Sequence, residues 1–262
     1  MKFEKISRRK FVLSTLLITP MAALADAFWW ENKWIRTRQI RVGNAKPTHR
    51  IVHFTDLHHK GDRAFLQRIV TEINALSPDL VCFTGDMIEE AKHLPEALEL
   101  LREIKSPLYG VPGNHDYWAK VDFPAINECF KATGGVWLMN EQVTTADGKL
   151  CVSGASCSRW FKDPRPKFAA PRPGLKNLML LHYPVFVENL SHQYDLILAG
   201  HSHGGQVRLP FYGSLLTPSA TGRYELGLFQ TPAGPLYVNP GLGWFAYPIR
   251  FNCRPEITVF EV

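Results

Sequence analysis

Cysteine is scarce in this sequence, and its five cysteines show no C-x-x-C spacing. A thiolate zinc site and a disulfide scaffold are therefore not expected, although a single bridge such as Cys151 to Cys157 is left open. Internal repeats, low-complexity tracts and Ser/Gly-rich linkers are also absent. With 45% hydrophobic residues over 262 positions, the chain can bury a substantial core as one large domain or two small ones.

A strong positive excess is missing from most of the chain. The formal net charge is +6, but the first ten residues contribute four of these charges, through five basic residues and one acidic residue. The remaining charge of about +2 is too small for the basic surface that nucleic-acid binding requires. A nucleic acid is therefore not an expected partner.

The first 27 residues carry the pattern of an export signal. The segment SRRKFVL places Arg8 and Arg9 ahead of the apolar stretch 11–25, which ends in small residues. This pattern is typical of a twin-arginine signal peptide, and the stretch is short for a membrane span of about 20 residues. It predicts an interaction with the twin-arginine export machinery and a periplasmic or cell-envelope location. Residues 1–27 would be cleaved or kept as an anchor, and a structural first helix is the alternative.

The next segment, residues 28–48, is expected to form an aromatic strap ahead of a single domain at 49–262. Its start, FWWENKW, is rich in tryptophan, a residue that favours the membrane interface. Two interpretations follow from this composition. The strap either associates with a membrane surface or packs against the domain.

Several short apolar runs end in polar residues of one chemical kind. These runs cover residues 50–59, 78–86, 107–116, 177–184 and 194–203. Their nearly continuous apolar character predicts strands that are buried on both faces. Helical stripes or helix-start prolines between them predict helices at 63–76, 94–104 and 123–135. Alternating strands and helices indicate an α/β protein, and the Gly- and Pro-rich last third predicts a second, more antiparallel sheet.

The polar residues that end these runs predict a metal site. They are Asp56, His58, Asp86, Asn114, His115, His182, His201 and His203. Taken singly, each has an ordinary structural explanation, such as a capping aspartate, a turn or a buried core histidine. In all five runs, imidazole and oxygen ligands lie at the same position relative to the predicted strand, namely at its end. This arrangement favours two divalent ions that share a bridging carboxylate.

These motifs resemble, in order and context, those of the calcineurin-like metallophosphoesterases. The matching segments are D-x-H at 56–58, GD at 85–86, GNHD at 113–116, His182, and GHSH at 200–203. The similarity spans roughly residues 50–262. The twin-arginine start, GHSHGGQ and the ending PIRFNCRPEITVFEV are similar to the exported branch of YaeI- and YkuE-type phosphodiesterases. The resemblance implies an α/β fold, a four-layer αββα sandwich in which helices flank two mixed β-sheets and the metal site lies at the strand ends.

By the same resemblance, seven side chains hold two divalent ions. One ion is assigned to Asp56, His58 and His203, the other to Asn114, His182 and His201, and Asp86 bridges them. Manganese is the favoured metal, with iron, zinc, nickel or magnesium as alternatives. His115 is expected to be the catalytic histidine beside the substrate, with Asp116 as its orienting partner.

The implied reaction is hydrolysis of a phosphodiester or pyrophosphate bond by a hydroxide that bridges the two ions. The expected substrate is a small phosphate ester or a lipid-linked one, of the UDP-2,3-diacylglucosamine type in lipid A synthesis or another cell-envelope phosphate. The alternative is a non-catalytic metal-binding envelope module that kept the fold.

The sequence departs from the family pattern at three places. Ser202 replaces the threonine of GHTH at a non-ligand position, and Glu89 stands where relatives with GD-x-x-D have aspartate. Trp244, Phe245 and Tyr247 occupy a loop in which smaller residues are expected. They predict either an apolar patch near the site or additional core.

Overall fold

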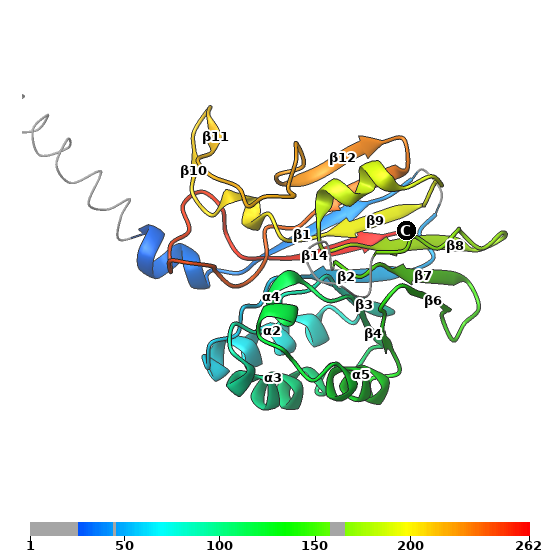
Figure 1. Ribbon diagram of the computed structural model, residues 1–262, viewed down its shortest axis with the longest axis horizontal. Helices are drawn as coiled ribbons and strands as arrows, with labels where there is room; N and C mark the ends of the chain where they lie inside the picture. The colour runs from blue at the N-terminus through cyan, green and yellow to red at the C-terminus, as the bar shows by residue number, and fades with distance from the viewer. Residues whose placement is uncertain (1–25, 44–45, 158–165) are drawn as a thin grey trace, which may run out of the picture.

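Two six-stranded mixed β-sheets form the centre of the computed structural model of this protein, which describes residues 26–43, 46–157 and 166–262 (Figure 1). The first sheet has the strand order β1-β14-β2-β3-β4-β5. All neighbouring strands in it run parallel to each other, except for the antiparallel pair of β14 and β2. Its strands are β1 (Arg36–Arg41), β2 (Arg50–Phe54), β3 (Leu80–Phe83), β4 (Leu108–Gly110), β5 (Val136–Trp137) and β14 (Glu256–Glu261).

The second sheet has the order β12-β13-β9-β8-β7-β6. Its strands are β6 (Glu141–Thr144), β7 (Leu150–Gly154), β8 (Lys176–Leu180), β9 (Leu196–Ala199), β12 (Gly227–Thr231) and β13 (Gly234–Val238). Only its two outer pairs are antiparallel, while β13, β9, β8 and β7 run parallel. The prediction of a second, more antiparallel sheet is correct for the pair β12 and β13 of the last third, but the centre of this sheet is parallel and consists mainly of earlier strands. The last strand, β14, leaves this region and inserts between β1 and β2 of the first sheet.

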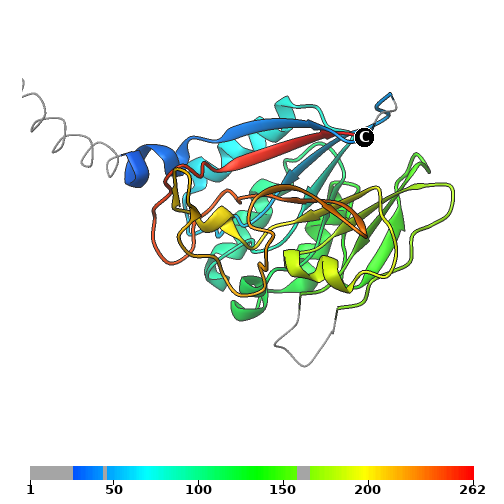
Figure 2. The same cartoon turned by 90° about the horizontal axis from the view of Figure 1, so that it is seen from above.

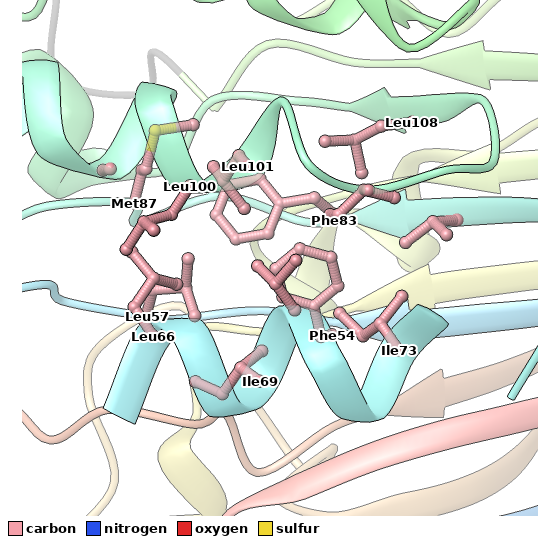
Figure 3. Packing of buried hydrophobic residues seen from close by; sticks show 14 of the residues in the cluster. Phe54, Leu57, Leu66, Ile69, Ile73, Phe83, Met87, Leu100, Leu101 and Leu108 are labelled. Atoms are coloured by element: carbon pink, nitrogen blue, oxygen red, sulfur yellow. The ribbon is translucent and has the colours of Figure 1, made fainter. Parts of the chain in front are cut away.

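Helices cover the outer face of the first sheet (Figure 1). They are α2 (Arg63–Ala75), α3 (Leu94–Leu101) and α5 (Phe123–Ala132), at the positions that the apolar stripes predict, with a short η3 (Ala91–His93) before α3. Alternate residues of the central strands face this layer, and Phe54 of β2 lies 5.0 Å from Phe83 of β3, centroid to centroid. Figure 3 shows Leu66 and Ile69 of α2 packed against these strands.

The other faces of the strands form a second core between the sheets. Ile51 and Cys82 of the first sheet pack with Leu178 and Leu198 of the second, and all four are fully buried. Both faces of β2 and β3 are therefore covered, which explains their nearly continuous apolar sequence. The outer face of the second sheet is covered by η4 (Pro184–Asn189) and loops, so this fourth layer contains a 3₁₀-helix in place of an α-helix.

The N-terminal part of the described chain belongs to the sandwich. β1 pairs in parallel with β14 over six residues, so residues 36–41 of the expected strap lie within the first sheet. Figure 2 shows the two strands, coloured blue and red, side by side. Before β1 come η1 (Asp26–Trp30) and η2 (Glu31–Lys33). The carboxylate of Glu31 is buried and accepts the backbone N–H of Asn252 at 2.8 Å. Residues 26–33 are therefore fixed to the loop that precedes β14.

The predicted export signal lies outside the described residues apart from its last two positions. Within the described chain, no helix combines the length and apolar character needed to span a membrane. All five cysteines are buried and free, so the Cys151–Cys157 bridge is not formed.

Candidate metal centre

The predicted site residues lie at the ends of strands, along a single edge of the sandwich. Asp56, Asp86 and Asn114 follow the parallel strands β2, β3 and β4 of the first sheet, while His182 and His201 follow β8 and β9 of the second. Open α/β sheets place their sites at this carboxyl edge. Asn114 also begins the short helix α4 (Asn114–Trp118), and His203 begins η5 (His203–Gly205).

The backbone is strained at this edge. Asp56, His58, Asp86, His201 and His203 all have positive φ angles, between 40° and 67°. Such angles are uncommon for residues with a β-carbon and tend to gather at functional sites. The close approach of the loops explains the motif glycines, because a β-carbon at Gly113 would lie 2.1 Å from a carboxylate oxygen of Asp86.

Asp56, His58 and His203 form the first cluster of buried ligand atoms. The Nε2 atoms of the two histidines lie 3.0 Å apart, and Oδ1 of Asp56 lies 3.3 Å from Nε2 of His203 and 3.8 Å from Nε2 of His58. Asp56 is held from behind by Thr55, whose hydroxyl donates to Oδ2 at 2.7 Å, and by the backbone N–H of His201.

Asp86, Asn114, His182 and His201 form the second cluster. Nε2 of His182 lies 2.9 Å from Oδ1 of Asn114, 3.2 Å from Nδ1 of His201 and 3.4 Å from Oδ2 of Asp86. The same Oδ2 atom lies 3.5 Å from Nε2 of His58 in the first cluster. One carboxylate oxygen therefore faces both groups of ligands.

Hydrogen bonds on the far sides of the rings fix which nitrogen carries a proton. A carbonyl oxygen only accepts, so Nδ1–H of His182 donates to Thr84 O at 2.7 Å and Nε2–H of His201 donates to Ser219 O at 2.7 Å. Nδ1 of His58 lies 2.8 Å from the carboxylate of Glu89. In the neutral rings, the lone pairs then point into the clusters, an arrangement typical of metal-ligating histidines. When the rings are neutral, these lone pairs and the neighbouring carboxylate and amide oxygens form a set of converging acceptors, which fits divalent cations.

The electrostatics of the cluster agree with a site for positive charge. Burial lowers the pKa of His58 and His182, but nearby carboxylates, Asp56 and Asp86 among them, outweigh it and raise both pKa values to about 9. For His201 and His203, burial dominates and lowers the pKa to about 3 and about 4. Burial opposes ionisation of Asp86, yet the neighbouring histidines hold its pKa below the ordinary value.

His115 lies at the rim of the cluster and is the most exposed of the predicted site histidines, with 17% of its side chain exposed. Its Nδ1 atom lies 3.2 Å from Oε2 of Glu89, and its ring meets that of His58 edge-on at 4.5 Å. Its backbone N–H donates to Oδ1 of Asp86 at 2.7 Å. The ring thus stands over the cluster from the solvent side.

The prediction that Asp116 orients His115 is wrong. Asp116 is fully buried, and its carboxylate accepts the backbone N–H groups of Asp86, Met87 and Gly113 at 2.8–3.0 Å. The turn of α4 directs this side chain inward, where it fixes the loop that carries Asp86. Glu89, whose role the sequence left uncertain, is the carboxylate that contacts His115.

The aromatic loop lies against the site. The ring of Phe245 lies 4.9 Å from that of His203, and Nζ of Lys60 lies 3.9 Å from the ring centre of Trp244. Tyr247 is largely exposed. Phe245 therefore lies near the site, whereas Tyr247 is only shown to be exposed. None of the three aromatic residues belongs to the described hydrophobic cores, although Leu242 at the start of the loop does.

One supporting residue is not among the predicted site residues. Arg250 is fully buried, and its guanidinium donates to backbone carbonyls of Pro240, Gly241, Gly243 and Cys253. These hydrogen bonds fix the loop of residues 240–253, which contacts Asp56 through the backbone N–H of Gly243. Arg250 lies in the C-terminal segment PIRFNCRPEITVFEV, which supports the branch resemblance, but no ligand motif or periodic pattern singles it out, so only the structure shows its role.

Comparisons with known proteins agree with this geometry. The profile of the calcineurin-like phosphoesterase family matches residues 49–205. The uncharacterised metallophosphoesterase YkuE of Bacillus subtilis is 30% identical, and the match covers 99% of this chain and 98% of that protein. The phosphodiesterase YaeI of Escherichia coli is 29% identical, with 98% of this chain and 99% of that protein covered.

A third relative has a more specific name. The UDP-2,3-diacylglucosamine pyrophosphatase LpxG of Chlamydia trachomatis is 28% identical over 95% of each chain. The named activities of YaeI and LpxG, together with the family match, leave no support for a non-catalytic module. This chain therefore belongs to the calcineurin-like phosphoesterase family and is a metal-dependent phosphoester hydrolase.

Proposed function

We propose that the site holds two divalent cations and hydrolyses a phosphodiester or pyrophosphate bond. Asp56, His58 and His203 would hold one cation, and Asn114, His182 and His201 the other, with Asp86 between them. The observation that carries this assignment is Oδ2 of Asp86, which lies 3.5 Å from a ligand atom of the first cluster and 3.4 Å from one of the second. A carboxylate shared in this way is the hallmark of a two-metal site.

Manganese is the proposed metal, with iron, zinc, nickel or magnesium as the other candidates. Imidazole together with carboxylate and amide oxygen suits borderline transition metals better than calcium, and no described cysteine lies among the candidate ligands. Two such cations would neutralise the charge of a phosphate group and would lower the pKa of water, so that hydroxide is available as the nucleophile near neutral pH.

The chain itself supplies the proton for the leaving group. His115 is proposed as the catalytic residue, because its ring stands at the solvent side of the cluster and its Nδ1 atom faces Glu89. With Nδ1–H held by this carboxylate, a protonated His115 presents Nε2–H to the leaving oxygen. Glu89 acts as a positioning residue, since it holds both His115 and the ligand His58.

The proposed substrate is a cell-envelope phosphodiester or pyrophosphate, of the UDP-2,3-diacylglucosamine type or another lipid-linked ester. The names of the relatives LpxG and YaeI support a substrate of this chemistry. We also propose that the twin-arginine signal in residues 1–27 directs the protein out of the cytoplasm to the periplasm or cell envelope. The paired Arg8 and Arg9 ahead of a short apolar stretch support this location.

A panel of substrates tests the proposed reaction. Turnover of bis-p-nitrophenyl phosphate, p-nitrophenyl phosphate, UDP-2,3-diacylglucosamine and cyclic nucleotides is measured after chelation and after addition of Mn²⁺, Mg²⁺ or Zn²⁺. Diester or pyrophosphate cleavage should vanish with chelator and return best with Mn²⁺, while the monoester reacts slowly. Metal-independent turnover, or a preference for the monoester, would contradict the proposal.

A further inference from the structure

Exposed apolar side chains gather in two segments that the metal centre does not use. Of the eleven large hydrophobic residues that are exposed in the described chain, eight lie in residues 28–34 and 208–216. In the first segment they are Phe28, Trp30 and Trp34. In the second they are Leu209, Phe211, Tyr212, Leu215 and Leu216. Single exposed hydrophobic residues are ordinary, but a concentration of this kind marks an interaction surface.

The second segment is a small hairpin of β10 (Arg208–Leu209) and β11 (Gly213–Ser214) with its tip in solvent. Phe211 at the tip is fully exposed and has a φ of 67°, a conformation that favours glycine or asparagine. The base is fastened instead: Arg208 donates to Gly204 O at 2.8 Å and pairs with Glu225 at 3.3 Å. A strained, exposed phenylalanine on a fixed base points to a function for the tip.

The two segments border the same hollow. A cavity of about 600 Å³ is lined by Pro210 of the hairpin and by Trp34, together with Arg36, Arg38 and Arg254. Both views of the molecule place the hairpin and η1 at the same end (Figures 1 and 2). A second hollow of about 310 Å³ is lined only by Trp30, Trp34, Lys33 and Arg68. Aromatic rings and cations therefore line both hollows at this end.

Five cations line the two hollows, and three of them have an acidic partner: Lys33 pairs with Asp62, Arg36 with Glu256 and Arg68 with Glu72. Of the three acids at the larger hollow, Glu31 and Glu256 are buried and accept Asn252 N–H and Tyr237 O–H, respectively, which leaves Asp26. The positive charge that this end offers to a partner therefore rests on Arg38 and Arg254, which have no carboxylate within 4.0 Å in the described chain. Tryptophan, exposed aliphatic residues and cations together match the interface of an anionic bilayer, where rings sit at headgroup depth and cations meet lipid phosphates.

We propose that these residues form a docking face for an anionic lipid bilayer, with the hairpin tip and the tryptophans entering the interface. The apolar stretch 11–25 of the sequence ends immediately before η1, so it joins the chain at this face. A second copy of the chain fits less well, because a two-fold interface would bring the same arginines face to face.

Docking would place the metal centre beside the membrane. The hairpin begins three residues after η5, which carries the proposed ligand His203. Only this consequence, access to a lipid-linked ester, rests on the proposed function. The docking face itself stands on exposure and charge.

A fluorescent label at the hairpin tip tests the proposal in the full-length chain. Phe211→Cys can be labelled selectively with an environment-sensitive nitrobenzoxadiazole group, because all five native cysteines are buried. The matched control is Leu228→Cys on β12, because Leu228 is also a large exposed hydrophobic residue but lies outside the face. Vesicles of phosphatidylglycerol and phosphatidylethanolamine should shift the emission at position 211 to the blue, and brominated lipid should quench it. Position 228 should show neither effect.

A second variant tests the charge. Arg38→Gln, which removes a cation without a carboxylate partner in the described chain, should weaken binding to these vesicles about fivefold and leave binding to phosphatidylcholine unchanged. A label at 211 that stays in water while the protein sediments with vesicles would overturn the proposal. A dimer in sedimentation velocity that Phe211→Ser dissociates, with no response to vesicles, would overturn it in favour of a second copy. All these variants should hydrolyse soluble bis-p-nitrophenyl phosphate at the wild-type rate, which separates this test from that of the catalytic site.

Discussion

Oε2 of Glu89 accepts a hydrogen bond from Nδ1 of His58 over 2.8 Å and so holds the ring of a proposed metal ligand from its far side. Partners of this kind fix the tautomer of a ligand and increase its basicity. Because the same oxygen lies 3.2 Å from His115, one carboxylate links a proposed ligand with the proposed proton donor.

Replacement of Glu89 should therefore weaken both metal binding and turnover. Glu89→Gln is expected to lower metal affinity about 10- to 100-fold, the range for loss of such a partner. The matched control is Glu96→Gln, because Glu96 makes the same contact with His59 at 2.7 Å, has similar exposure and lies outside the clusters. Metal titration and steady-state kinetics measure both effects. Equal losses in the two variants would mean that Glu89 has no special role.

Asp86→Asn should cost more activity than the loss of any ligand that serves one ion. An amide has no charge to share, so both ions should bind more weakly and turnover should fall by at least about 10²-fold. Metal analysis by mass spectrometry should show loss at both positions, whereas His201→Ala should affect mainly one. Two retained ions with near-normal turnover would disprove the bridge.

His115→Ala should leave the metal content intact and slow turnover by about 10² to 10⁴, the contribution of a general acid. The loss should be greatest for alkyl esters, because their leaving groups need a proton, and smallest for p-nitrophenyl esters. The measurement is kcat across a series of leaving groups at full metal loading. If alkyl and aryl esters slow equally, His115 stabilises charge and does not donate a proton.

The position of the site could be predicted because strand ends obey simple rules. Parallel strands that are buried on both faces bring their carboxyl ends to one edge, so Asp56 and Asp86 meet without any tertiary information. His182 follows a strand of the other sheet, and only the family resemblance predicted that it joins them. Orientation at the next residue is harder to predict. In GNHD, His115 faces solvent while Asp116 turns inward, because the first turn of α4 separates their directions by about 100°.

Long-range pairing could not be predicted in the same way. The segment 256–261 has the alternation and β-branched residues of a strand, but nothing local states that it pairs with β2 and β1 rather than with β13. Arg250 shows the same limit, since its partners are backbone carbonyls that any sequence provides. Contacts that use only the backbone leave no pattern in the side chains.

Replacement of Arg8 and Arg9 by lysine should block export and leave the protein in the cytoplasm. The twin-arginine pathway reads the pair as an address, whereas lysine keeps the charge and helix propensity of a structural first helix. Fractionation into cytoplasm, membrane and periplasm measures the outcome. An unchanged distribution would refute the export proposal and leave the metal centre untouched.

His53 should make the protein less stable as the pH falls below about 6.5. The ring is fully buried on β2, Nε2 bonds the hydroxyl of Thr84 at 2.8 Å, and burial lowers its pKa from 6.5 to about 3 despite the charge of Asp56. Between these two values the unfolded chain binds the proton and the folded one does not. Stability is therefore complete above pH 6.5 and is lost progressively down to about pH 3.

The expected loss from this histidine between pH 7 and pH 5 is about 2 kcal/mol. His53→Gln keeps a hydrogen bond to Thr84 without a titrating ring, so its free energy of unfolding should fall by that much less over the same interval. Urea unfolding of both proteins at the two pH values gives the difference directly, and the acid-sensitive histidines His201 and His203 cancel because both proteins contain them. Parallel losses in the two proteins would mean that His53 is protonated in the folded state, with its charge accommodated between the sheets.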